Sequence, residues 1–170
     1  MNIRAAVPAD AAALAELAER TFRDAFAADN LPAHLDAHCT ASYSPEIQER
    51  DTIDEAVRTL VVEDADGRLV AYAQLRIGPV PACVTGAEPI ELWRFYVDRG
   101  FHGRGLAQQL MARVDETAKA LQTSTLWLGV WERNYRAQAF YRKCGFSDAG
   151  THTFMLGTDS QTDNLMARKL

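Results

Sequence analysis

The sequence lacks the features that mark several protein classes. It has only three cysteines in 170 residues, widely spaced and without a Cys-x-x-Cys pair, so neither a disulfide framework nor a metal site is expected. No apolar run approaches the ~20 residues that span a bilayer, and the N-terminus lacks the apolar stretch of a signal peptide. We therefore expect a cytoplasmic protein with no membrane partner.

Positive charge is also scarce. The chain has 18 Lys and Arg residues against 23 Asp and Glu residues, a net charge of −5, which argues against a nucleic-acid partner. Apolar residues make up 48% and charged residues 24%, the composition of an ordinary globular protein. Because the sequence has no internal repeat and no linker, it predicts a single domain spanning residues 1–170.

The acidic residues are concentrated in the first half of the chain. Residues 21–66 carry eleven acidic and three basic residues, whereas the remainder of the chain has a small excess of positive charge. Two interpretations stay open at this point. The acidic residues can simply form the solvated faces of helices, or they can form a surface that attracts a cationic substrate.

The spacing of apolar residues predicts alternating helices and strands. In the first half, a strand at 3–7 and a helix from residue 8 to about 26 precede short helices at 32–39 and 45–58 and strands at 59–63 and 69–75. In the second half, strands at 90–97 and 125–131 alternate with helices at 105–121 and 134–144, and strands near 146–154 and 163–170 follow. This order predicts an α/β fold with a mixed sheet and helices on both faces.

The glycine-rich turn after the strand at 90–97 is the most informative segment. Gly100, Gly103 and Gly105 lie directly before a predicted helix, whose first N–H groups are unpaired and favour a phosphate. Arg99, Arg104 and a protonated His102 would add positive charge. A Rossmann turn would need GxGxxG near the first strand, and a P-loop would need Gly-Lys-Ser/Thr. Neither motif is present. Two interpretations of the turn stay open: a phosphate-binding turn of another kind, or a connection that binds no ligand.

The run His102-Gly103-Arg104-Gly105-Leu106-Ala107 resembles the acetyl-CoA loop, [Q/R]xxGx[G/A], of the GNAT (Gcn5-related N-acetyltransferase) superfamily, with His in place of Gln or Arg. The run from Asn134 to Phe146 resembles the later signature N-xx-A-xx-FY-xxx-GF of the same superfamily. The resemblance covers essentially the whole chain and implies one GNAT domain with a mostly antiparallel sheet of about seven strands. The segments 127–132 and 156–163 are similar to bacterial polyamine acetyltransferases of the Pai type.

The resemblance implies an acyltransferase with acetyl-CoA as cosubstrate and no metal. Nine residues are expected to contact acetyl-CoA: Tyr96, Val97, His102, Gly103, Arg104, Gly105, Leu106, Ala107 and Asn134. The strands at 90–97 and 125–131 would splay apart to receive its pantetheine arm, and a backbone N–H there would stabilise the developing oxyanion.

Two side chains are expected to move protons. A Lys-like amine is charged at pH 7, so a general base is needed, and Glu91 occupies the strand position where GNAT enzymes often carry a catalytic glutamate. Strand alternation places Glu91, Trp93, Phe95 and Val97 on one side of the sheet. Tyr141 matches the superfamily's general acid, which protonates the leaving thiolate.

The acceptor amine is expected to bind to the acidic first half. Asp29, Phe26 and Tyr43 are the predicted substrate-binding residues, with Asp24 or Glu46 as further carboxylates for a small, polyamine-like cation. The alternatives are an enzyme that acetylates a protein N-terminus or lysine, and a non-catalytic acyl-CoA-binding module. Homodimers are common among GNAT proteins, which is an expectation from the resemblance alone.

Overall fold

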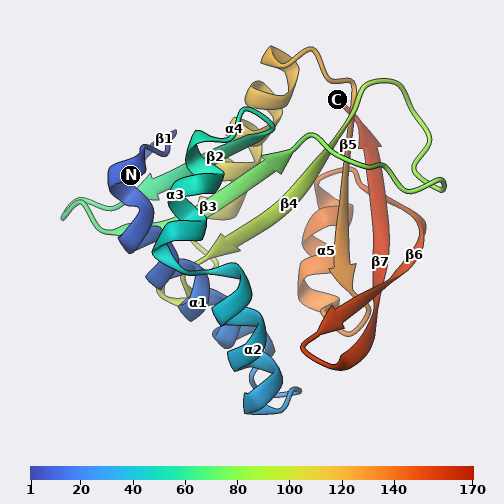
Figure 1. Ribbon diagram of the computed structural model, residues 1–170. Helices are drawn as coiled ribbons and strands as arrows, with labels where there is room; N and C mark the ends of the chain where they lie inside the picture. The colour runs from blue at the N-terminus through green and yellow to red at the C-terminus, as the bar shows by residue number, and fades with distance from the viewer.

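The computed structural model describes residues 1–170, and its centre is one seven-stranded sheet (Figure 1). The strands are β1 (Asn2–Ala5), β2 (Val57–Glu63), β3 (Leu69–Arg76), β4 (Pro89–Val97), β5 (Thr125–Trp131), β6 (Ser147–Leu156) and β7 (Asp159–Lys169). Their order across the sheet is β1-β2-β3-β4-β5-β7-β6. All neighbours are antiparallel except β4 and β5, so the predicted mixed, mostly antiparallel sheet is confirmed.

Helices cover both faces of this sheet, as predicted. The helices are α1 (Ala11–Phe26), α2 (Pro32–Ser42), α3 (Pro45–Ile53), α4 (Leu106–Ala120) and α5 (Tyr135–Lys143). The first three lie on one face, which we call the α1 face, and α4 and α5 lie behind the sheet on the α4 face (Figure 1). No helix is both long and apolar enough to cross a membrane.

Each face has its own apolar core. On the α1 face, Leu14, Leu17, Ala18 and Phe22 of α1 pack against Val61 and Tyr72 of the sheet. On the α4 face, the core contains Leu106, Leu110 and Val114 of α4 together with Leu126 and Leu128 of β5. These helical residues recur every three or four positions, so the apolar stripe of each helix is the surface that it buries.

Two predicted boundaries are wrong. The helix expected at 45–58 ends at Ile53, because the Asp54 carboxylate accepts a hydrogen bond from the Ala56 N–H at 2.8 Å and forms a turn. Strand β2 then begins at Val57. The last strand starts at Asp159 rather than at residue 163, because β6 and β7 form a hairpin that turns at Gly157, where φ is 60°.

Candidate active site

Strands β4 and β5 separate along their length. They pair in parallel only where Pro89, Ile90 and Glu91 lie opposite Thr125, Leu126 and Trp127. Beyond Glu91 and Trp127 the two strands share no register, although each remains paired on its other side. A gap therefore opens in the middle of the sheet, as the resemblance predicted.

The backbone of β4 presents free groups to this gap. The Asp98 N–H donates to the Val70 carbonyl of β3. Because every second residue of an antiparallel strand bonds to the same neighbour, the backbone N–H and C=O of Tyr96 also point toward β3. The N–H and C=O groups of Phe95 and the N–H of Val97 consequently point toward β5 without a partner there, whereas the Val97 carbonyl oxygen is bonded to the His102 ring. The Tyr96 backbone groups are thus engaged with β3, whereas the Val97 N–H remains available to the acyl donor.

Strand β5 offers a matching edge. The Glu132 N–H donates to Thr162 and the Leu170 N–H donates to Ser124, so the even-numbered residues of β5 bond to β7. The backbone groups of Gly129 therefore face the gap, and Gly129 is exposed. The two strands thus present unpaired main-chain groups to each other, as a pair of edges does before a third strand is added.

The start of α4 lies at the end of β4 and has an open cap. Gly105 is the N-cap in the left-handed conformation, with φ of 78°, and no side chain caps the helix. Gly103 has φ of 74°, and a β-carbon at either glycine would meet no atom within 4 Å. This space and the unpaired N–H groups of the first helical turn suit a phosphate group.

His102 connects this turn to α5. Its Nε2 lies 2.8 Å from the Val97 carbonyl oxygen, and its Nδ1 lies 2.9 Å from a guanidinium nitrogen of Arg136. A guanidinium only donates, so Nδ1 must accept, and the proton is on Nε2. His102 is therefore neutral in this arrangement, which corrects the expectation of a protonated imidazole. Arg99, Arg104 and Arg136, all exposed, supply the positive charge instead.

Tyr141 lies on α5 within the apolar core of the α4 face. Its ring contacts Phe95, Phe140 and Phe146, with centroid distances of 6.3, 5.5 and 5.7 Å. Burial raises the pKa of the Tyr141 phenol well above its usual value, so the hydroxyl stays protonated. Asn134 begins α5 and accepts a hydrogen bond from the Ala137 N–H at 3.1 Å, as an N-cap.

A β-bulge in β4 changes which residues share a face. Gln74 lies opposite Arg94 and Leu75 lies opposite Leu92, so Trp93 is an extra residue. The bulge reverses the alternation: Phe95 and Val97 join Ile90 and Leu92 on the α4 face. The predicted grouping of Glu91 with Phe95 and Val97 is therefore wrong, because Glu91, Arg94 and Tyr96 lie on the α1 face.

Glu91 is held by an arginine. Its Oε2 accepts hydrogen bonds from Arg76 Nε at 2.9 Å and from Arg76 Nη2 at 2.6 Å, whereas Oε1 has no such partner. Burial raises the pKa of Glu91 above its usual range, and Arg76 opposes that shift. Trp93 lies between Arg76 and Arg94, whose guanidinium carbons are 4.0 and 3.8 Å from its ring centroid.

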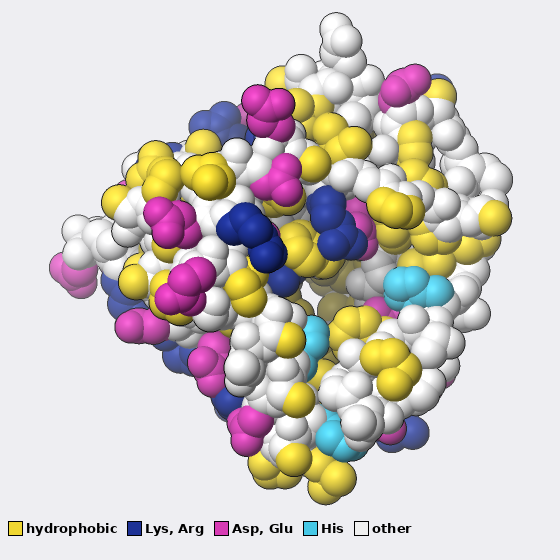
Figure 2. Space-filling view, viewed as in Figure 1, with side chains coloured by type: hydrophobic (Ala, Val, Ile, Leu, Met, Phe, Trp, Pro, Cys, Tyr) yellow, Lys and Arg dark blue, Asp and Glu magenta, His cyan; other side chains and the backbone are white.

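The α1 face is hollowed beside the gap. Figure 2 shows the hollow between α1–α2 and the β5–β7–β6 half of the sheet, with Lys or Arg and His side chains at its rim. Two contacts close one end: Gln161 of β7 donates to Asn30 at 2.6 Å, and Thr158 lies 3.4 Å from His34. We call this space the acceptor chamber.

Aromatic side chains connect the two sides of the acceptor chamber. Phe26 of α1 lies 5.7 Å from Trp131 of β5, and His38 of α2 lies 5.7 Å from Phe154 of β6, between ring centroids. Burial lowers the pKa of His38 to about 4, with Arg94 adding to the effect. His38 is thus a neutral ring near pH 7, and the chamber walls are largely aromatic.

The predicted substrate residues are distributed unevenly. Phe26 is half-buried at the chamber wall, and Tyr43 is buried beneath it against Phe22 and His38. Asp29 lies on the exposed turn after α1, and Asp24 and Glu46 are also exposed. Most acidic side chains of residues 21–66 are thus solvated, and the buried exception, Asp51, pairs with Arg94 at 3.3 Å.

Three residues that the sequence did not single out meet near the gap. Asp163 of β7 lies 3.6 Å from His152 of β6, and a β-carbon at Gly129 would lie 3.3 Å from the Asp163 carboxylate. The period-two pattern Trp127-x-Gly129-x-Trp131 places this glycine on one face of its strand. It gives no sign that β7 would be the neighbour, since that pairing joins residues far apart in the chain.

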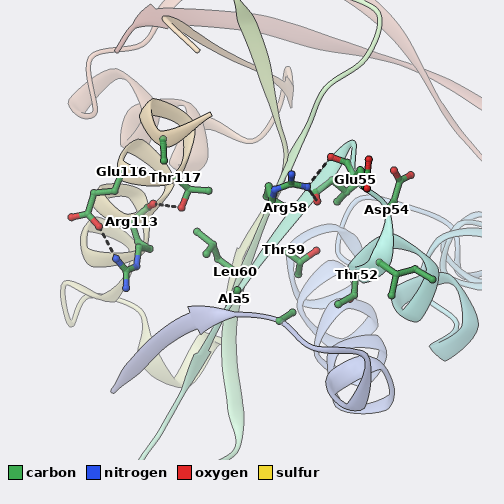
Figure 3. Close-up of a pocket in the computed structure, with 14 residues that line it drawn as sticks. Ala5, Thr52, Asp54, Glu55, Arg58, Thr59, Leu60, Arg113, Glu116 and Thr117 are labelled. Atoms are coloured by element: carbon green, nitrogen blue, oxygen red, sulfur yellow. Dashed lines mark hydrogen bonds and ion pairs between the residues drawn. The ribbon is translucent and has the colours of Figure 1, made fainter. Parts of the chain in front are cut away.

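A second hollow of about 740 Å³ lies elsewhere, between β1, β2, the end of α3 and α4 (Figure 3). Both of its arginines are already engaged: Arg113 pairs with Glu116 at 2.8 Å, and Arg58 donates to backbone carbonyls of Glu55 and Val57. This hollow contains none of the predicted site residues.

Comparisons with known proteins agree with this geometry. A model of the acetyltransferase (GNAT) family matches residues 12–146. An uncharacterized N-acetyltransferase of Mycobacterium tuberculosis is 36% identical over 161 residues, covering 95% of this chain and 98% of that protein.

Two solved structures show the same fold. PaiA N-acetyltransferase of Thermoplasma acidophilum in complex with coenzyme A has a TM-score of 0.83 at 21% identity, covering 99% of this chain and 98% of that one. A ribosomal-protein-alanine N-acetyltransferase of Brucella melitensis has a TM-score of 0.70 at 24% identity, covering 100% of both chains.

Proposed function

Because the chain belongs to the acetyltransferase (GNAT) family, we propose that it transfers the acetyl group of acetyl-CoA to a primary amine of a small cationic molecule. Membership of this family supports acetyl-CoA-dependent N-acetyltransferase activity. The choice of acceptor is our proposal. It rests on one observation: the acceptor chamber contains two carboxylates, Glu91 and Asp163, and is closed at one end by contact between α2 and the β6–β7 hairpin.

The gap and the turn before α4 fit the acyl donor. The open space at Gly103 and Gly105 and the uncapped helix start would hold the diphosphate, with Arg99 and Arg104 nearby. The N–H groups of Phe95 and Val97 and the edge of Gly129 would pair with the pantetheine arm. Acetyl-CoA supplies an activated thioester carbonyl, and one of these N–H groups would stabilise negative charge on its oxygen.

The acceptor must lose a proton before it can attack. Making a Lys-like amine neutral at pH 7 costs about 4.6 kcal/mol. We assign this step to Glu91, whose free Oε1 can accept the proton directly or through water while Oε2 stays with Arg76. Because Arg76 compensates the charge of Glu91, the carboxylate does not hold the reacting nitrogen firmly in its ammonium form.

The leaving thiolate needs a proton in return. We assign this step to Tyr141, which matches the general-acid tyrosine of the family and keeps its proton because it is buried. Transfer from phenol to thiolate is uphill by roughly 2 kcal/mol for unperturbed groups. Tyr141 is therefore expected to act mainly by a hydrogen bond that strengthens as the C–S bond breaks.

The closed end of the chamber favours a small acceptor over a protein chain. An extended peptide that crossed the α1 face would have to pass between α2 and the β6–β7 hairpin, where Gln161 contacts Asn30 and Thr158 contacts His34. A free amine can instead enter from the open side that Figure 2 shows.

A thiol-release assay with acetyl-CoA and a panel of acceptors tests the proposal. The panel contains aliphatic monoamines and diamines, amino acids, and peptides with a free N-terminal alanine or an internal lysine. The expected result is the highest kcat/KM for small cationic amines. A higher kcat/KM for a peptide would overturn the choice of acceptor, and coenzyme A binding without turnover of any amine would overturn the enzymatic proposal.

A further inference from the structure

The two carboxylates of the acceptor chamber differ in how their charge is compensated. Glu91 accepts two hydrogen bonds from Arg76, at 2.6 and 2.9 Å. Asp163 has no arginine or lysine partner, and its nearest basic group is His152 Nε2 at 3.6 Å, longer than a hydrogen bond. The Asp163 side chain is nevertheless only 14% exposed. It is thus a largely buried negative charge with little compensation.

Gly129 leaves the Asp163–His152 pair open to the chamber. A β-carbon at this position would lie 3.3 Å from Asp163 Oδ2 and 3.4 Å from His152 Nε2, so any side chain would press on both. The Gly129 backbone also borders the gap where the thioester is expected. The pair therefore lies next to the reacting centre without being part of it.

A carboxylate without a basic partner is suited to bind an ammonium group that keeps its positive charge throughout the reaction. A carboxylate that binds an ammonium group favours its charged form and raises its pKa, which opposes deprotonation. Asp163 would consequently hinder the reacting nitrogen if it held that nitrogen. It would stabilise a second ammonium group of the same molecule, one that keeps its proton throughout the reaction.

We propose that Asp163 binds a second ammonium group of the acceptor, so that the preferred acceptor is a short diamine. The inference rests on the proposed function. Gly129, beside which the Asp163 carboxylate lies, is two residues along β5 from Trp127, the register partner of Glu91. This offset is roughly 7 Å along the strand, and the step from β4 across β5 toward β7 adds to the separation of the two carboxylates, each of which would bind its nitrogen from outside. An extended diamine of four or five methylene groups places its nitrogens about 6–8 Å apart.

The test compares a four-carbon diamine with butylamine in the wild-type enzyme and in Asp163→Asn. Wild-type enzyme is expected to favour the diamine in kcat/KM. The substitution should raise the KM for the diamine about tenfold, as expected for loss of a partly buried ion pair. The KM values for butylamine and for acetyl-CoA should stay within about twofold of wild type. Asp148→Asn, an exposed carboxylate on β6, is the matched control and should behave as wild type.

The outcomes separate the inference from the proposed function. If wild-type enzyme acetylates neither amine, the proposed function fails. If it acetylates both and Asp163→Asn leaves the diamine-to-butylamine ratio unchanged, only the inference is overturned. A substitution that lowers both rates equally, with coenzyme A binding and thermal unfolding unchanged, would place Asp163 in the proton transfer and also overturn it.

Discussion

Tyr141 shows how packing fixes the chemical state of one side chain. Three phenylalanine rings surround the phenol, and burial raises its pKa, so it carries its proton near neutral pH. A residue in this state can donate a hydrogen bond but cannot act as a base. Its position is therefore suited to the second half of the reaction, after the amine has attacked.

Replacing Tyr141 by Phe removes that donor and keeps the ring. We expect kcat to fall at least tenfold, a modest value for loss of a general acid, with the affinity for coenzyme A unchanged. Steady-state kinetics and calorimetric titration measure the two quantities. Tyr135→Phe on the same helix, where the side chain is exposed, is the control. An unchanged kcat in Tyr141→Phe would mean that the phenol only packs.

The sequence could locate Tyr141 and Asn134 because each depends on a local motif within one helix and the turn before it. It could not show that Glu91 lies on the opposite face from Phe95 and Val97, because the bulge at Trp93 is a property of two strands and not of β4 alone. Asp163 and His152 were missed for a related reason. Their meeting with Gly129 depends on the pairing of β5, β7 and β6, and no local pattern encodes that order.

At the scale of the element, the start of α4 combines two requirements in one residue. Gly105 has to end the turn in the left-handed conformation and must leave its surroundings open. A side chain at this position would not collide with any atom, since a β-carbon meets nothing within 4 Å. The penalty for a substitution is therefore in the backbone conformation itself.

Gly105→Ala is expected to lower the free energy of unfolding by about 1–2 kcal/mol, the strain of an alanine in the left-handed region. It should also raise the KM for acetyl-CoA, because the helix start would shift to relieve the strain. Urea unfolding and steady-state kinetics measure both. The control is Gly78→Ala. Gly78 lies in an exposed loop and has no positive φ, so this substitution should change neither the free energy of unfolding nor the KM for acetyl-CoA. Equal effects of the two substitutions would contradict this account.

At the scale of the whole molecule, the site forms where three distant parts of the chain meet. The α1–α2 region, the β4–β5 gap and the β6–β7 hairpin each supply part of the acceptor chamber, and the hairpin joins the first region through Gln161 and Asn30. The alternation of helices and strands predicted the mixed sheet and its two helical layers. It could not predict that the hairpin would touch the α1–α2 region, because the contacting residues are 124 and 131 positions apart in the chain.

Gln161→Ala removes the hydrogen bond to Asn30 and should loosen this end of the chamber. We expect kcat/KM for an alanyl peptide to rise about fivefold, the equivalent of one hydrogen bond of about 1 kcal/mol, with little change for a small amine. The same acceptor panel in the thiol-release assay measures this. A uniform loss of activity toward every acceptor would show instead that the contact supports the fold.

The bulge at Trp93 also restricts how the gene can change in length. Deleting one codon between Leu92 and Phe95 would restore a regular ladder and rotate one half of β4 against the other. An apolar residue would then occupy the acceptor chamber, or a carboxylate would enter the core of the α4 face. The exposed residues 77–80 after β3 can lose a residue without this exchange. In an alignment of relatives, a gap within β4 is therefore expected to coincide with loss or change of activity, whereas gaps at residues 77–80 are expected to be neutral.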